Sequence, residues 1–111
     1  MEAPSLTPEN PLAFNQDCVR RKRIFWTHHV NMGLQGRSIS REAILAAVEQ
    51  YDLVESYPGD KYLPSYLILA PESTEAFHIL FATDVSGDNV RVVTAYRPDS
   101  AEWLPDLKTR R

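Results

Sequence analysis

Two apolar segments near the carboxyl end of the chain place the strongest constraint on its fold. Residues 76–84 (AFHILFATD) and 89–97 (NVRVVTAYR) are rich in β-branched and aromatic residues, which favours β-strands. The short polar loop between them contains Ser86, Gly87 and Asp88, which is typical of a hairpin. The sequence therefore predicts two neighbouring antiparallel strands.

Further strand signals occur over residues 23–30 (RIFWTHHV), 53–57 (LVESY) and 65–70 (SYLILA). Ser40 precedes an amphipathic segment that continues to Tyr51, and a serine at this position caps the first free amides of a helix. We therefore predict an α+β fold, a meandering antiparallel sheet of about four strands. One main helix, preceded by a short turn, is expected on one face of the sheet. Parallel pairing would need further crossover helices, which the sequence does not indicate.

The 111 residues suit one domain, which we place at residues 23–111. Residues 1–22 contain Pro4, Pro8 and Pro11 and no apolar period, so they are predicted to form a flexible amino-terminal arm. The last segment begins with a turn at Pro98 and is expected to form a short helix interrupted by Pro105.

Several classes of chemistry find no support in the sequence. The chain begins without a charged and apolar leader and holds no run of about 20 apolar residues, which predicts a cytoplasmic protein without a membrane partner. Four glycines and no phosphate-binding loop disfavour a nucleotide site. Cys18 and the three histidines match no usual zinc spacing, so neither a metal nor another cofactor is expected.

Charge is distributed unevenly along the chain. The net charge is −3, yet residues 18–37 carry five basic and no acidic residues, while residues 38–75 carry seven acidic and two basic ones. A basic region can attract a phosphate backbone, and an acidic one repels it. The composition therefore leaves a polyanionic partner and a protein partner both open.

Four motifs, in their order, resemble a known family. The motifs are RSISREAILAAVE, VESYPGDKYLPSYLIL, FHILFA and VVTAYRPDSAEW, and together they resemble the bacterial "domain of unknown function 4258" family over residues 26–108. That family is similar to the RelE/ParE toxin superfamily. The resemblance implies a compact RelE/ParE-like sheet with helices on one side. For the RelE branch it also implies metal-independent cleavage of ribosome-bound RNA, which needs a proton-transfer group and cations for the phosphate.

The resemblance also selects candidate site residues. His29 and Arg37 match a histidine and an arginine of the family, whereas Gly33 stands where the family has another arginine, so a two-arginine phosphate clamp is incomplete. His78 matches the histidine of a central strand, and Tyr96 lies where the final strand ends. The predicted catalytic residues are His29, His78 and Tyr96, and the predicted substrate-binding residues are Arg37, Arg97 and Lys61.

Two questions stay open at this level. His78 and Tyr96 share a face only if paired residue numbers of the hairpin have an even sum, as with His78 opposite Thr94 or Tyr96. His78 also lies among apolar residues, where a purely structural histidine is common. The leading hypothesis is a toxin-related protein that acts on RNA or the ribosome. The alternative is a non-catalytic interaction module or degenerate toxin relative that binds an antitoxin, another protein or a second copy of itself.

Overall fold

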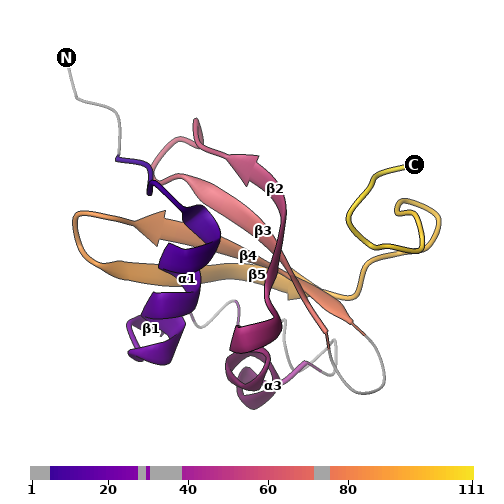
Figure 1. Cartoon of the computed structure of the whole chain (residues 1–111), viewed down its shortest axis with the longest axis horizontal. Coiled ribbons are helices and arrows are strands. Elements are labelled where there is room, and N and C mark those ends of the chain that lie inside the picture. Colours follow the sequence, from indigo (N-terminus) through magenta and orange to yellow (C-terminus); the bar gives the residue numbers. More distant parts are fainter. Residues whose placement is uncertain (1–5, 28–29, 31–38, 72–75) are drawn as a thin grey trace.

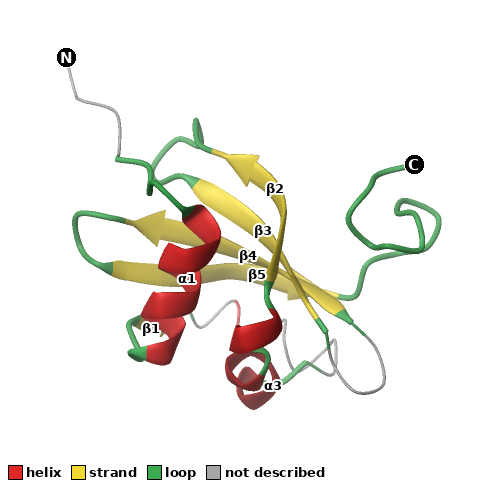
Figure 2. Cartoon of the chain, viewed as in Figure 1, coloured by secondary structure: helices red, strands yellow, loops and turns green. Residues whose placement is uncertain are grey.

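The computed structural model describes residues 6–27, 30, 39–71 and 76–111. A single sheet of five strands lies beside two helices, with the strand order β1-β5-β4-β3-β2 (Figure 1). The described elements are α1 (Pro11–Arg20), β1 (Ile24–Trp26), α3 (Arg41–Ala46), the 3-10 turn η1 (Val48–Gln50), β2 (Asp52–Tyr57), β3 (Ser65–Ala70), β4 (Phe77–Asp84) and β5 (Asn89–Tyr96). Figure 2 shows both helices on the same side of the strands. The predicted α+β class is confirmed.

Strands β2 to β5 form the predicted antiparallel meander. His78 pairs with Tyr96 and Ile79 with Ala95, so the register has an even sum at this end of the hairpin. A bulge between Leu80 and Phe81 then shifts the register toward the loop. His78 and Tyr96 therefore share a face of the sheet, as the RNA hypothesis required.

The sheet is mixed and has one strand more than predicted. β1 pairs parallel to β5, with Ile24 opposite Val90, so the expectation of a wholly antiparallel sheet of about four strands is wrong. The Arg23 guanidinium donates to the carbonyl groups of Gly87 and Asp88 in the hairpin loop, which anchors the start of β1 beside β5. The crossover that parallel strands require is supplied by all the intervening chain, including α3 and three strands.

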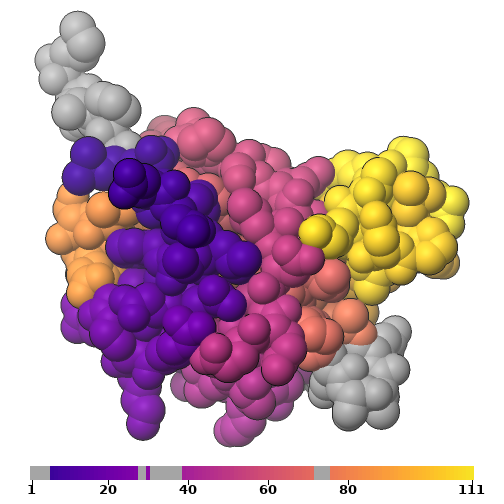
Figure 3. Space-filling model, viewed as in Figure 1, coloured from indigo at the N-terminus to yellow at the C-terminus, as the bar shows by residue number. Residues whose placement is uncertain are grey.

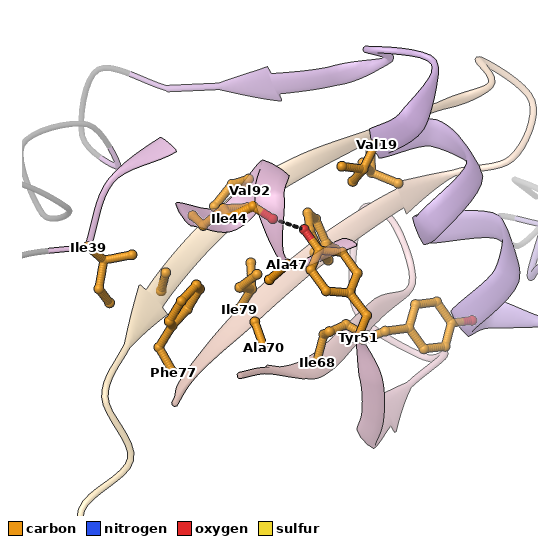
Figure 4. Packing of buried hydrophobic residues seen from close by; sticks show 14 of the residues in the cluster. Val19, Ile39, Ile44, Ala47, Tyr51, Ile68, Ala70, Phe77, Ile79 and Val92 are labelled. Atoms are coloured by element: carbon orange, nitrogen blue, oxygen red, sulfur yellow. Dashed lines mark hydrogen bonds between the residues drawn. The ribbon is translucent and has the colours of Figure 1, made fainter. Parts of the chain in front are cut away.

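The Ser40 cap is confirmed. The Ala43 amide donates to Ser40 Oγ over 2.9 Å, and α3 follows directly. Ile44 and Tyr51 then face the sheet, where the Tyr51 hydroxyl donates to the Ile44 carbonyl over 2.6 Å (Figure 4). This hydrogen bond satisfies a buried phenol and ties the end of the helical segment to its start.

The predicted flexible arm is wrong for residues 11–20, which form α1. Asn10 caps this helix by accepting from the Ala13 amide, and Pro11 occupies its first turn, where a proline costs no hydrogen bond. Cys18 and the residue after it are buried in the core, and the Asn15 side chain is buried against β4. The helix was missed because polar residues separate its few apolar contacts with the core, and its buried Asn15 acquires a partner only through Thr83 of β4.

The carboxyl-terminal segment also differs from the prediction, because residues 98–111 form turns and no helix. The Asp106 side chain accepts from the Lys108 amide, the Thr109 amide and the Thr109 hydroxyl. These bonds compete with helical ones, and Pro105 removes a helical donor. A bridge between Trp103 and Arg110 closes the segment into a loop.

The two faces of the sheet have different surroundings. Phe77, Ile79 and Phe81 of β4 point toward the helices and belong to the main core. The alternate residues of β4, from His78 to Ala82, point to the opposite face. The carboxyl-terminal segment covers one end of that face, at His78, and the other end contains a hollow.

Candidate functional site

A row of residues crosses the helix-free face of the sheet and forms the first part of the candidate site. Phe25 pairs with Arg91, Arg91 with Ala82, Ala82 with Ser65, and Ser65 with Tyr57. Directly paired residues project from the same face of a sheet. Two small side chains therefore occupy the middle of the row, with large side chains at its ends.

A hollow of about 600 Å³ lies over these small residues. The loop between β2 and β3 forms one wall through Lys61 and Tyr62, while Arg91 and Val93 of β5 form the other. The Tyr62 side chain is 78% exposed, and Phe25, beside Arg91 in the row, is 50% exposed. The hollow thus has a floor of small residues, an exposed tyrosine in one wall, and an exposed phenylalanine on the strand next to the other wall.

Two cations stand on opposite walls of this hollow. Lys61 Nζ lies 5.3 Å from the centre of the Tyr62 ring, and both residues are exposed. The Arg91 guanidinium lies 3.9 Å from a carboxylate oxygen of Asp84, with 55% of the arginine side chain exposed. Such a long, exposed ion pair is weak, so Arg91 can contact an anionic ligand without a large penalty.

His78 and Tyr96 form the second part of the candidate site, at the other end of the same face. His78 Nδ1 lies 3.3 Å from the Tyr96 hydroxyl, and His78 Nε2 lies 2.7 Å from the Leu107 carbonyl oxygen. The Trp103 ring packs edge-on against the His78 ring, with 4.7 Å between ring centres. His78 is 0% exposed and Trp103 is 1% exposed.

These contacts fix the protonation of the His78 ring. A carbonyl oxygen only accepts hydrogen bonds, so Nε2 carries the proton and Nδ1 accepts from the Tyr96 hydroxyl. Burial lowers the pKa of His78, although the hydrogen bond to the Leu107 carbonyl opposes that effect. Burial likewise raises the pKa of Tyr96. Both groups are neutral near pH 7; His78 is buried and Tyr96 is partly buried.

A charged cluster holds the carboxyl-terminal segment over this pair. The Arg110 guanidinium donates to both carboxylate oxygens of Glu55, over 2.9 and 3.0 Å, and the Tyr57 hydroxyl donates to the same carboxylate. Arg110 thereby lowers the pKa of Glu55. Lys108 forms an ion pair of 2.7 Å with Asp52.

The structure brings together some of the predicted site residues. His78 and Tyr96 are in contact, and Lys61 lies at the hollow. On β4, Ala82 in the hollow is four residues from His78, a separation of about 13 Å at 3.3 Å per residue. Arg97 directly follows β5 beside Tyr96 and is partly buried. His29 and Arg37 lie outside the described residues, so their roles stay predictions.

Sequence reasoning missed three residues of this face. Phe25 and Arg91 become neighbours only through the parallel pairing of β1 with β5, which the sequence did not indicate. Trp103 is buried against His78, a contact that depends on the folded carboxyl-terminal segment and that the sequence alone does not indicate. Among the described residues, no three His, Cys, Asp or Glu side chains gather as a metal site would require.

None of the described helices is long and apolar enough to cross a membrane.

Comparison with protein families gives one match, to a model described as "Domain of unknown function (DUF4258)", over residues 26–97. The match covers well over half of the chain, begins at Trp26, where the resemblance begins, and ends at Arg97, short of the residue 108 that the motifs indicated. No curated protein and no solved structure matches the chain significantly.

Proposed function

Since the chain belongs to the DUF4258 family, whose description assigns no activity, we propose from its site that it binds single-stranded RNA. The observation that carries the proposal is the hollow on the helix-free sheet face, where Lys61 and Arg91 on opposite walls outnumber the one lining carboxylate, Asp60. The exposed Tyr62 ring lines this hollow, and the exposed Phe25 ring lies on the strand beside Arg91. The order of the sequence motifs supports the finer assignment, a relative of the RelE/ParE toxins.

The chemistry of this hollow suits a nucleotide strand. Single-stranded RNA is held by aromatic side chains that stack on its unpaired bases and by cations that contact its phosphates. Tyr62 and Phe25 offer the rings, and Lys61 and Arg91 offer the cations. The small side chains of Ala82 and Ser65 leave room for a planar base between the two walls.

Binding is better supported than cleavage in this arrangement. A cleaving enzyme must bring a proton-transfer group within hydrogen-bonding distance of the ribose 2′-hydroxyl. His78 is fully buried, and both of its ring nitrogens have partners within the chain. We therefore assign the hollow as the binding surface and regard His78 as unable to act on RNA while it is covered.

A protein-interaction module is the second candidate. It is favoured by the net charge of −3 and by the exposure of Phe25 and Val93, which are 50% and 44% exposed beside the β1 edge of the sheet. An apolar sheet edge can pair with an antitoxin-like protein or with a second copy of this chain. Concentration-dependent self-association without RNA binding is the result that this candidate predicts.

The test is fluorescence anisotropy with a short labelled single-stranded RNA of mixed sequence, in the absence of divalent metal. For two phosphate contacts, the slope of log K against log salt is expected near −1.4, at about −0.7 per contact. Lys61→Gln and Arg91→Gln should each reduce the size of that slope by about 0.7, and Tyr62→Ala should weaken binding at every salt concentration.

Arg20→Gln is the matched control, because Arg20 lies on α1 and forms an ion pair with Glu49 away from the hollow. This control should leave RNA affinity within about twofold of the unmodified chain, at the usual small effect of an exposed ion pair. Undetectable binding at low salt, or equal losses for the control and the two hollow variants, would refute the proposal.

A further inference from the structure

The carboxyl-terminal segment, residues 98–111, begins where the family match ends. The match stops at Arg97, so the residues that cover His78 lie beyond the region shared with the family. Figure 3 shows this segment (yellow) as a distinct projection at one end of the molecule. The residues that cover His78 thus lie outside the matched region.

The segment is organised largely by its own contacts. The Leu104 amide donates to the Thr109 carbonyl over 2.8 Å, and the Arg111 amide donates to the Glu102 carbonyl over 2.9 Å. The Asp106 side chain holds the turn between these bonds, as described above. A segment bonded mainly within itself is a local unit, which can leave the sheet and open to solvent while the strands stay folded.

Its attachment to the sheet rests on one buried ring and a few polar contacts. Trp103 lies between the His78 ring and the Arg110 guanidinium, which is 4.5 Å from the centre of the indole ring. The Leu107 carbonyl accepts from His78, and the two ion pairs to β2 are partly exposed: 53% of the Arg110 side chain and 39% of the Lys108 side chain are accessible. The single, exposed Lys108–Asp52 pair is of the kind that is weak and sensitive to salt, whereas the bidentate Arg110–Glu55 pair is stronger and is the main polar contact between the segment and β2.

We propose that residues 98–111 are a displaceable cap, and that its release exposes His78 and Tyr96 on the same sheet face as the hollow. Removal of Trp103 and Leu107 uncovers the histidine ring and frees its Nε2. The released face continues from the hollow to His78 over about 13 Å, at 3.3 Å per residue along β4. The cap itself is independent of the ligand, and only its role as a control on RNA binding rests on the proposed function.

Hydrogen exchange of the unmodified full chain tests the cap directly. The Trp103, Leu104 and Arg111 amides are hydrogen-bonded within the segment and should exchange at least tenfold faster than the amides of β4 and β5. Equal protection in the cap and the central strands would overturn the proposal, because the segment would then leave only when the whole chain unfolds.

A charge reversal in the full chain gives the second test. Arg110→Glu opposes Glu55 and removes the cation over Trp103, so it should accelerate cap exchange further and move the pKa of His78, followed by NMR, upward toward its ordinary value. The strand amides should keep their protection, and adding Glu55→Arg should return cap exchange to the rate of the unmodified chain. Arg20→Glu, which breaks the ion pair with Glu49 on the helix side, should leave the cap unchanged.

Arg110→Gln serves as the milder variant, and a cap that exchanges no faster in either variant overturns the proposal. RNA binding is then measured separately with Arg110→Gln, which is expected to increase RNA affinity at least twofold by lengthening the accessible face. Fast cap exchange without RNA binding supports the cap and refutes the proposed function. Slow cap exchange refutes the cap whether or not RNA binds.

Discussion

A buried hydrogen bond between α1 and β4 allows a sharp test of how the amino-terminal helix is held. Thr83 Oγ1 donates to Asn15 Oδ1 over 2.9 Å, and both side chains are 0% exposed. Thr83→Val keeps the shape of the side chain but removes the donor, which leaves the Asn15 oxygen buried without this partner. An unsatisfied buried polar group costs about 1–3 kcal/mol, so the free energy of unfolding should fall by that amount.

Urea unfolding followed by circular dichroism measures this loss as a lower midpoint with an unchanged slope. Thr83→Ser is the matched control, because it keeps the hydroxyl and loses one methyl group, worth about 0.8 kcal/mol. Asn15→Leu combined with Thr83→Val should destabilise less than the sum of the single changes, since the double variant leaves no unpaired partner. If Thr83→Val changes the free energy of unfolding by less than about 0.5 kcal/mol, α1 is not docked on β4 as described.

Two further predictions concern the covered end of the sheet and the hairpin loop. Burial lowers the pKa of His78 below its ordinary value of 6.5, so an NMR titration should find the imidazole neutral at pH 6.5. The pKa of His78 is lower in the folded chain than in the unfolded chain, so its contribution to the free energy of unfolding is complete above pH 6.5 and is lost as the pH falls through the folded pKa. His78→Gln should therefore flatten the dependence of the free energy of unfolding on pH in this range. An unchanged pH dependence would contradict the prediction. Gly87→Ala should lower the free energy of unfolding by about 1 kcal/mol, because the new Cβ would lie 2.4 Å from Asp84 Oδ2, and the Asp84 carboxylate accepts from the Gly87 amide in the loop. The control is Ser86→Ala at an exposed position of the same loop. Equal urea midpoints for the two variants would contradict the prediction.

Local sequence signals predicted the elements that local chemistry determines. Ser40 starts α3 because its side chain satisfies a free amide, and the polar loop at Gly87 joins β4 to β5 because it reverses the chain. The register at His78 could be stated only as two alternatives, since nothing in the loop composition selects between them. The structure chooses the one with His78 opposite Tyr96.

Long-range contacts explain what the sequence did not reveal. Asn15 reads as a solvated residue until Thr83, distant in sequence, supplies its partner. β1 reads as one more antiparallel strand until the hairpin loop binds Arg23 and aligns the two strands in parallel. The hollow forms between β5 and the loop that joins β2 to β3, so Arg91 could not be recognised as a site residue, whereas Lys61 could be selected through the family resemblance.

The parallel pairing of β1 with β5 also has a consequence for how the chain assembles. β1 is synthesised before the other strands of the sheet, and its partner β5 is the last of them, so the sheet can be completed only after residue 96 has been made. Contacts between segments so distant in sequence form slowly, because they close a long loop. Until β1 docks, the outer edge of β5 stays open to strands from other chains, and a truncation that removes residues before Thr27 would make that hazard permanent.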